Sequence, residues 1–425
     1  MNFPHGLRAL RSRNFRRFIA GQGTSHIGNW VQMVAVSWLV YRLTGSTVML
    51  GLSAFALHIP FFAVAPFAGV LLDRMDLRRV LFITNIVAVL QGAVLLVLVA
   101  TGQIQAWHLI LGNLVLGVVN AFDSPARQSL LVQLVDDRAD LPNAIALNSS
   151  TMNSGRFIGP MVGGSVIATF GESWGFASNL LLRSAVIAAL ISLRVPRRPP
   201  RPPGRGVLRE LAEGLQYVRG FLPARGALSL LACCSLTVQS YSSLMPWFAS
   251  HRFQGNSATL GLLVSSAGVG AVAGMVYLAM RSSIVGLFRL IGLTAAIAGA
   301  SLVLFTFTDR LWLGMLLVCL TGMAMMLTAA ATNRVVQTFV PDGLRSRVAA
   351  IYMLCFLGVS PFGALANGWV ADHVGPPVAL ALSGSLALVA SLLYLRRLPQ
   401  IRAVVGPAYR KLGLLPAKPG DAPRS

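Results

Sequence analysis

The sequence has too little charge to cover a water-soluble surface. Charged residues make up only 11% of the 425 residues, and 13 acidic residues stand against 35 Lys and Arg. Because hydrophobic residues account for 55% of the chain, the polar surface available is far too small for a soluble globule. This composition excludes a soluble protein and favours one that crosses a membrane several times.

Patterns that bind metals or cofactors are also missing. The four cysteines fall inside apolar runs and lack the spacing of metal ligands, so we expect buried free thiols and no disulfide framework. They are Cys233, Cys234, Cys319 and Cys355. The chain contains no His-Glu-x-x-His pair, no aspartate cluster and no Gly-rich phosphate loop with lysine. We therefore predict no enzyme, no cofactor and no metal site.

The positive charge is confined to loops and tails. A net charge of +22 would suggest nucleic acid as the partner of a soluble protein. Here roughly thirty of the thirty-five Lys and Arg fall on one side of the predicted spans, which is the pattern that orients membrane proteins. We expect both termini in the cytoplasm, a location in the inner membrane, and no nucleic-acid partner.

Apolar runs of about 20 residues recur along the chain, and a helix of that length crosses roughly 30 Å of hydrocarbon. The first run is too long for a signal-peptide core and lacks a cleavage site, so we interpret it as an uncleaved span. The predicted spans lie at about 17–41, 48–72, 80–101, 107–123, 145–170, 175–194, 227–249, 259–280, 286–308, 311–332, 348–370 and 377–395. The sequence thus predicts an all-α integral membrane protein with twelve transmembrane helices.

A basic segment divides the twelve spans into two sets of six. Its Pro-rich first part should be extended. Residues 207–219 place apolar side chains at helical spacing, which predicts a basic amphipathic helix on the inner leaflet, with a soluble regulatory helix as the alternative. The expected parts are a bundle at 1–194, the linker at 195–225, a second bundle at 226–398 and a disordered tail at 399–425.

A short charged loop separates the second span from the third. Its pattern is Gly-x-x-x-Asp-Arg-x-x-x-Arg-Arg, formed by Gly69, Asp73, Arg74, Arg78 and Arg79. A loop that only sets orientation would need neither the glycine nor the aspartate. The loop resembles the signature loop of the major facilitator superfamily, although Asp76 stands where that family usually carries glycine.

This resemblance implies two pseudo-symmetric six-helix bundles with alternating access. Segments 128–135 and 333–340, about 205 residues apart, are weakly similar and fit such a repeat. We expect Asp73 to hold the halves together by meeting the positive N-terminus of the eleventh span, with Arg127 as a further partner.

The fifth span carries a second motif, made of Gly155, Gly159, Pro160, Gly163 and Gly164. Small residues at this spacing let helices approach closely, and proline bends the helix and frees a carbonyl group. An ordinary packing groove would look the same. The Gly-Pro-x-x-Gly-Gly pattern resembles that of antiporter-type exporters in the superfamily. With the segments 38–46 and 123–128, it resembles the bacterial branch of enterobactin-exporter-like and macrolide-efflux-like proteins.

Polar residues on the first, fourth and seventh spans are candidates for the substrate cavity, because the resemblance places these helices around it. They are Gln22, Ser25, Asn29, Gln32, Asn113, Asn120, Gln239 and Ser242. The ionisable residues His26, His58, Arg156 and Arg183 join them, since charge inside a membrane is costly and usually functional. Hydrogen bonding between helices is the alternative role.

The sequence therefore predicts a monomeric secondary active transporter in the lipid bilayer that exports a small amphipathic or anionic molecule. An importer of the same fold and a non-transporting scaffold or sensor are the alternatives. The anionic preference rests on Arg156 and Arg183 facing the cavity without a midplane carboxylate. The coupling ion stays open; if protons drive export, His26 or His58 should carry one.

Overall fold

A computed structural model of the chain describes residues 5–72, 75–193 and 207–411. The described part is helical and contains no strand. The N-terminal half (5–193) contains η1 (His5–Arg11), α1 (Arg13–Thr44), α2 (Thr47–Leu72), α3 (Leu77–Ala100), α4 (Ala106–Leu131), η2 (Arg138–Asp140), α5 (Leu141–Phe170) and α6 (Glu172–Ser192).

After α7 (Val207–Gly220), the C-terminal half (222–396) runs from α8 to α15. It comprises α8 (Leu222–Thr237), η3 (Gln239–Leu244), α9 (Met245–Trp247), η4 (Phe248–Arg252), α10 (Ser257–Met280), α11 (Leu287–Phe305), α12 (Leu311–Phe339), α13 (Asp342–Met353), η5 (Leu354–Gly358), α14 (Ser360–Val374) and α15 (Pro376–Arg396). A further helix, α16 (Leu398–Lys411), follows.

Ten helical segments of the described chain are long and apolar enough to cross a membrane. They include α8 to η4 as one segment and α13 to α14 as another. The remaining two predicted spans correspond to α1 and α5, which are 32 and 30 residues long but carry more polar residues. Both pack inside the bundle, α1 along α5 and α6, and α5 along α10. The all-α membrane fold is thus confirmed, and a count of twelve requires that α1 and α5 also cross.

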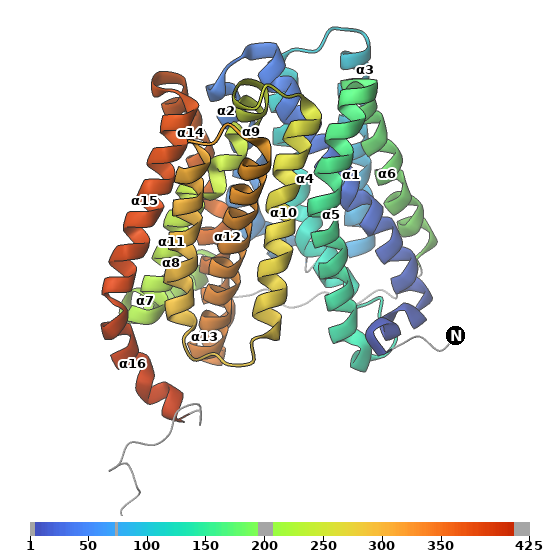
Figure 1. Ribbon diagram of the computed structural model, residues 1–425. Helices are drawn as coiled ribbons and strands as arrows, with labels where there is room; N and C mark the ends of the chain where they lie inside the picture. The colour runs from blue at the N-terminus through green and yellow to red at the C-terminus, as the bar shows by residue number, and fades with distance from the viewer. Residues whose placement is uncertain (1–4, 73–74, 194–206, 412–425) are drawn as a thin grey trace, which may run out of the picture.

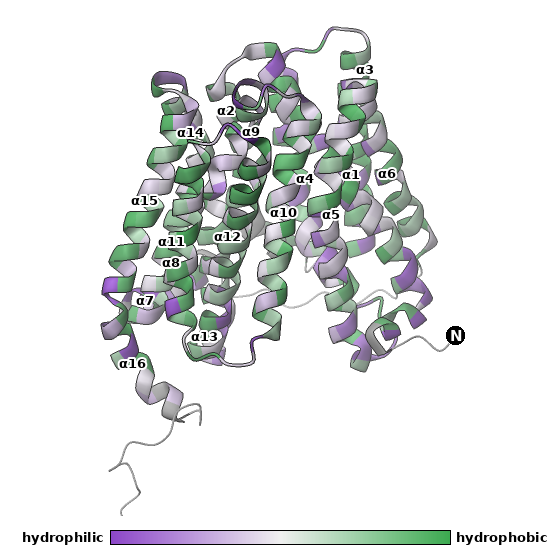
Figure 2. Cartoon of the chain, in the orientation of Figure 1, coloured by the Kyte–Doolittle hydropathy of each residue, from purple (hydrophilic) through white to green (hydrophobic). Residues whose placement is uncertain are grey.

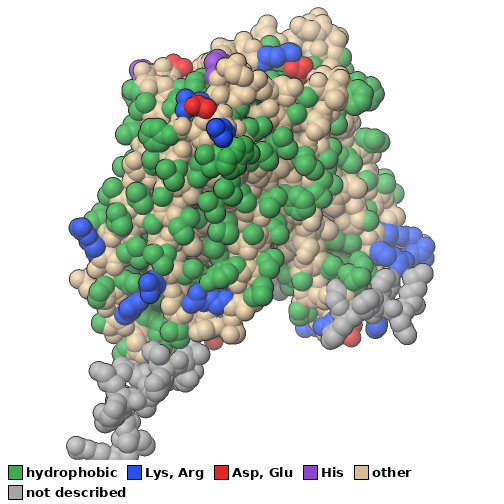
Figure 3. Space-filling model, viewed as in Figure 1, with side chains coloured by type: hydrophobic (Ala, Val, Ile, Leu, Met, Phe, Trp, Pro, Cys, Tyr) green, Lys and Arg blue, Asp and Glu red, His purple; other side chains and the backbone are tan. Residues whose placement is uncertain are grey.

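The helices form two bundles side by side, with most of the blue-to-green N-terminal half on the right of Figure 1 and most of the C-terminal half on the left, where α2 lies next to α14. Hydrophobic residues run along the helices of both bundles (Figure 2), and their side chains cover much of the face shown in Figure 3. Leu181, Met280 and Leu386 are 74%, 81% and 58% exposed, which suits contact with lipid. Arginines gather where α1 begins and α15 ends; we call this the basic end and the other the opposite end.

The two halves meet along a seam formed by α5 with α10 and by α2 with α14. Glycines face each other there: a Cβ atom on Gly164 would lie 2.9 Å from the Cα atom of Gly261, and one on Gly368 3.1 Å from that of Gly51. Hydrogen bonds across the seam run from Thr47 Oγ1 to the Gly368 carbonyl oxygen (3.0 Å) and from Ser257 Oγ to that of Gly164 (3.1 Å). These contacts close the molecule toward the opposite end.

Toward the basic end the halves move apart. Helices α5 and α10 diverge in Figure 1, and Figure 3 shows the lower edge of the molecule notched between the halves. We call this space the cleft. Glycines bring α5 and α10 close together between Gly164 and Arg156, whose carbonyl oxygen faces Gly268. The cleft lies toward the basic end of the molecule.

The predicted amphipathic helix corresponds to α7, which packs on α13 rather than lying free on the membrane surface. Val218 is 6% exposed in a cluster with residues of α8, α12 and α13, and Glu213 forms an ion pair with Arg347 (2.7 Å). Leu215, one of the apolar residues at helical spacing in 207–219, is 40% exposed.

The predicted disorder of the tail is wrong for residues 399–411, which form most of α16. Ile401, Val405 and Tyr409 are buried against the C-terminal half, and the Tyr409 hydroxyl donates to the Ile284 carbonyl oxygen (3.2 Å). The helical spacing of these apolar residues was the signal that the prediction missed. Residues 412–425 lie outside the described part.

Candidate functional site

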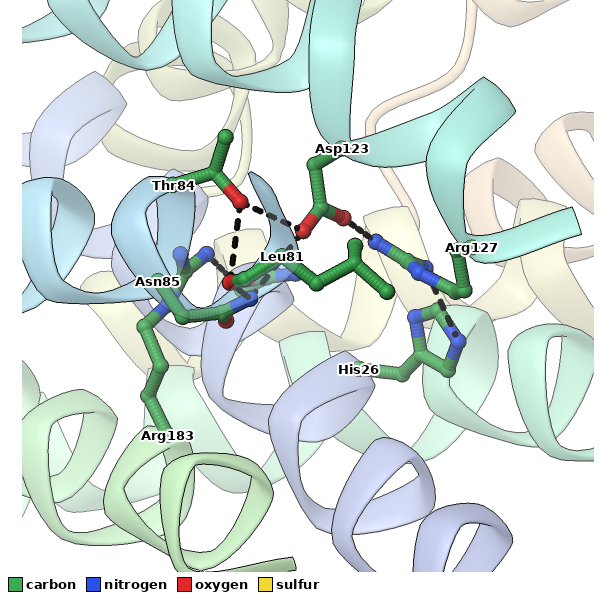
Figure 4. A network of polar contacts seen from close by, with 8 residues as sticks. His26, Leu81, Thr84, Asn85, Asp123, Arg127 and Arg183 are labelled. Atoms are coloured by element: carbon green, nitrogen blue, oxygen red, sulfur yellow. Dashed lines mark hydrogen bonds and ion pairs between the residues drawn. The ribbon is translucent and has the colours of Figure 1, made fainter. Parts of the chain in front are cut away.

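A cluster of charged and polar residues lies inside the N-terminal half, with Asp123 of α4 at its centre (Figure 4). The carboxylate is 5% exposed and accepts hydrogen bonds from Thr84 Oγ1 (3.2 Å) and Asn85 Nδ2 (3.0 Å) of α3. Its other oxygen pairs with the guanidinium group of Arg127, one turn further along α4. A buried carboxylate is stable as an ion only when it is paired and hydrogen-bonded in this way.

Arg127 extends this cluster to α1. Its Nη1 atom lies 3.4 Å from Nε2 of His26 (Figure 4). The sequence predicted Arg127 as a partner of Asp73, whereas the structure pairs it with Asp123. Asp73 and Arg74 lie outside the described residues.

The described part of the charged loop caps helices of the N-terminal half. Arg78 donates to the carbonyl oxygens of Leu190 (2.7 Å) and Ile191 (2.8 Å) at the end of α6. Asp76 caps the N-terminus of α3 by accepting from the backbone N–H groups of Arg78 (3.0 Å) and Arg79 (3.3 Å). Gly69 lies in the last turn of α2. The aspartate at the unusual position thus has a local structural role.

The polar stripe on α1 faces neighbouring helices of the same half. Gln32 donates to Gln91 Oε1 of α3 (2.9 Å) and accepts from Asn179 of α6. Asn29 accepts from Arg183 of α6. Gln22 and Ser25 are 2% and 4% exposed. In this conformation α1 is packed between α5 and α6, so these polar residues do not line a cavity as predicted. Hydrogen bonds between helices account for Asn29 and Gln32.

The two membrane arginines occupy different environments. Arg183 is 5% exposed, donates to Asn29, and lies within electrostatic range of Asp123, which the sequence did not identify as its partner. Arg156 of α5 is half-buried, with its guanidinium carbon 6.0 Å from the centre of the Trp30 ring. Only Arg183 therefore belongs to the charged cluster.

The other predicted cavity residues are dispersed. Asn113 donates to the carbonyl and hydroxyl oxygens of Ser53 (3.1 and 2.9 Å) and so joins α4 to α2. His58 is exposed on the face of α2 that carries Phe62, and Phe62 meets Phe362 of α14. Asn120 and Gln239 are half-buried, and Ser242 is exposed. His58 therefore faces the C-terminal half, whereas Asn113 joins two helices.

The fifth-helix motif serves two interfaces. Gly155, Gly159 and Gly163 pack against α1, where a Cβ atom on each would lie 2.8 Å or less from His26, Trp30 or Val31. Gly164 faces Gly261 of α10, and a Cβ atom on Gly261 would lie 2.4 Å from the carbonyl oxygen of Pro160. The motif therefore positions α1 on one side and builds the seam on the other.

The C-terminal half repeats the α3–α4 contact without charge. Thr294 of α11 and Thr328 of α12 share a hydrogen bond of 2.8 Å, and Thr328 is 205 residues beyond Asp123, the spacing of the internal repeat. A second neutral network was missed by the sequence analysis: Asn367 donates to Ser240 (2.7 Å) and accepts from Ser383 (2.6 Å). The buried charge cluster is thus a feature of one half.

Comparisons with known proteins agree with this architecture. The family described as "Transmembrane secretion effector" matches residues 5–410. The multidrug efflux pump Tap of Mycolicibacterium fortuitum is 27% identical over 367 residues, 83% of this chain and 88% of that protein. The enterobactin exporter EntS of Escherichia coli O1:K1 is 25% identical over 402 residues, 93% and 92% of the two chains. The crystal structure of the POT family transporter PepTSo has a TM-score of 0.73 at 12% identity, covering 92% of this chain and 99% of that one, a likeness of fold alone.

Proposed function

Since the chain belongs to the transmembrane secretion effector family of the major facilitator superfamily, we propose that it exports a small amphipathic or anionic molecule by alternating access. It is a secondary transporter of the cell membrane and not an enzyme. The predicted resemblance to the efflux branch is confirmed, because the relatives include a multidrug efflux pump and an enterobactin exporter. Their printed substrates support a siderophore, an antibiotic or a metabolite as the cargo.

One observation carries the mechanism. The halves are in contact at the opposite end and separated at the basic end, which is one of the two states that alternating access requires. The concentration of arginine at the basic end supports a cytoplasmic location for it. The structure would then be the cytoplasm-open state, in which an exporter loads its cargo.

The direct test is transport by purified protein in vesicles of known protein orientation. We expect export-directed flux of at least one compound from a panel of siderophores and antibiotics. A scaffold or sensor would move none of them, and an importer would move them the other way. Either result would contradict the proposed export.

The gate can be tested at Asp73. We propose that Asp73 meets the N-terminus of α13 when the basic end is closed, because a helix N-terminus carries partial positive charge. Asp73→Asn should weaken that closed state and raise the labelling of a cysteine placed at Met152, half-exposed on α5. Asp76→Asn is the matched control, because Asp76 caps α3 within one half. Unchanged labelling together with full transport would reject the gate.

Coupling can be tested at the two membrane histidines. If a proton drives export, we expect the double variant His26→Gln, His58→Gln to lose the dependence of flux on a pH gradient. His108→Gln is a suitable control, since His108 lies at the opposite end and accepts from the Gln105 backbone N–H (3.0 Å). Gradient-driven flux that survives in the double variant would assign coupling to another group or ion.

A further inference from the structure

Arg156 lies at the contact between the two halves. Its backbone is on α5, and its carbonyl oxygen faces Gly268 of α10. Pro160 has no N–H to donate to this carbonyl group, so the helix itself leaves that oxygen free. The guanidinium group approaches Trp30 of α1 and lies within electrostatic range of Tyr241 of η3. One group from each half therefore lies near it.

No described carboxylate neutralises the charge of Arg156. Within the described part of the chain, its side chain forms neither a hydrogen bond nor an ion pair, and its Trp30 contact is through the aromatic ring. Among the described acidic residues, Asp123 is the one inside the bundle, and it is paired with Arg127. The other described carboxylates lie near the two ends of the helices. Among the described residues, the guanidinium group of half-buried Arg156 is thus left without a hydrogen-bond acceptor or a carboxylate.

Such an uncompensated charge inside a membrane protein is costly unless a ligand neutralises it. A guanidinium group presents a planar set of donors that matches the two oxygens of a carboxylate or the adjacent oxygens of a catecholate or phosphate. The neighbouring Trp30 ring adds aromatic area beside this charge, and the buried Tyr241 lies within electrostatic range of it. The combination suits an amphipathic acid, with its anionic group on the arginine and its aromatic part on the rings.

We propose that Arg156, together with Trp30 and Tyr241, forms the subsite that binds the anionic group of the exported molecule. This inference rests on the proposed function. Of Arg156 and Arg183, on which the predicted anionic preference rests, it assigns the acid-binding role to Arg156. Arg183 is excluded because it donates to Asn29 beside Asp123 inside the N-terminal half. When the basic end closes, the same ligand would be held between α1 and α5 of one half and η3 of the other.

The test uses dansylglycine and its neutral amide as probes, with binding to the purified full-length protein followed by fluorescence. We expect the wild type to bind the acid about tenfold or more tightly than the amide, because the acid adds a charge-assisted hydrogen bond. Arg156→Gln should remove this preference while leaving the affinity for the amide unchanged. Arg156→Lys should keep part of it, since the charge remains but the planar donors are lost.

A merely structural role for Arg156 would lower the affinity for both probes equally, and this would overturn the proposal. Equal affinities in the wild type, a preference retained in Arg156→Gln, or binding of neither probe would also overturn it. The unfolding temperature of each variant shows whether it is folded, and Arg156→Lys serves as the second variant. Flux of the siderophore and antibiotic panel through Arg156→Gln separates the two proposals. If this variant still exports neutral compounds, the proposed export stands whatever the binding assay shows. The subsite is then judged by the binding data alone.

Discussion

Replacing Asp123 with alanine should cost about 3–5 kcal/mol of the free energy of unfolding, the usual consequence of removing one partner of a buried ion pair. The change would leave Arg127 without its carboxylate, while Thr84 and Asn85 would keep only their hydrogen bonds to the Leu81 carbonyl oxygen. Arg183 would lose the compensating charge nearby. We expect a fall in the thermal unfolding temperature of the purified protein that is large enough to reduce its yield.

The internal repeat supplies the control. Thr328→Val removes the equivalent contact in the C-terminal half. Only neutral hydrogen bonds, to Thr294 and to the Ala324 carbonyl oxygen of the same helix, are lost, so the change should cost only about 1 kcal/mol. Asp123→Asn should fall between the two, because the amide oxygen can still accept from α3 while the ion pair is lost. Equal unfolding temperatures for Asp123→Ala and Thr328→Val would show that the charge cluster adds nothing beyond its neutral counterpart.

The second large effect is expected at the seam. A methyl group on Gly164 would lie 2.4 Å from the carbonyl oxygen of Ser257, and backbone atoms cannot move aside without separating α5 from α10. Overpacking of this kind costs about 1–3 kcal/mol, which changes the ratio of two states by roughly 5- to 150-fold. Gly164→Ala should therefore depopulate the state that is closed at the opposite end and reduce transport about tenfold or more.

Cysteine labelling from the opposite end measures this shift directly and should increase in Gly164→Ala. Gly261→Ala, which places the methyl group 2.4 Å from the carbonyl oxygen of Pro160, should behave in the same way. Gly23→Ala is the control, because its methyl group would meet Thr151 at an ordinary 3.8 Å. Normal transport and labelling in both seam variants would mean that the seam tolerates separation and does not set the conformational equilibrium.

The composition and the two motifs were sufficient to predict the membrane class, the family and the approximate positions of the spans. They placed Asp123 at the end of the fourth span, because the polar stretch 123–128 ended the apolar run. The helix instead continues through Pro125 to Leu131, which puts Asp123 inside the bundle and one helical turn from Arg127. A hydropathy pattern shows only where apolar residues stop. It cannot show that α4 continues beyond that point, where Asp123 and Arg127 pair within the helix.

The orientation of the α1 stripe shows the second limit. Spacing established that Gln22, Ser25, Asn29 and Gln32 share a face. It could not show that α3 and α6 would supply matching amides such as Gln91 and Asn179. Which neighbour a helix face meets depends on contacts between residues 59 and 147 positions apart, and these are not encoded in local periodicity.

Irregular turns in the seventh and eleventh spans distinguish the C-terminal half from the N-terminal half. We expect the two halves to differ in how well they tolerate substitutions. Within the described membrane helices, the 3-10 turn η3 and the π turns η4 and η5 interrupt spans of the C-terminal half, while the N-terminal half has a web of charged and amide contacts. Mutations that alter cargo preference should therefore accumulate around η3 and η5, where the backbone can adapt. We expect substitutions in the charged cluster around Asp123 to be tolerated less well than substitutions at these turns.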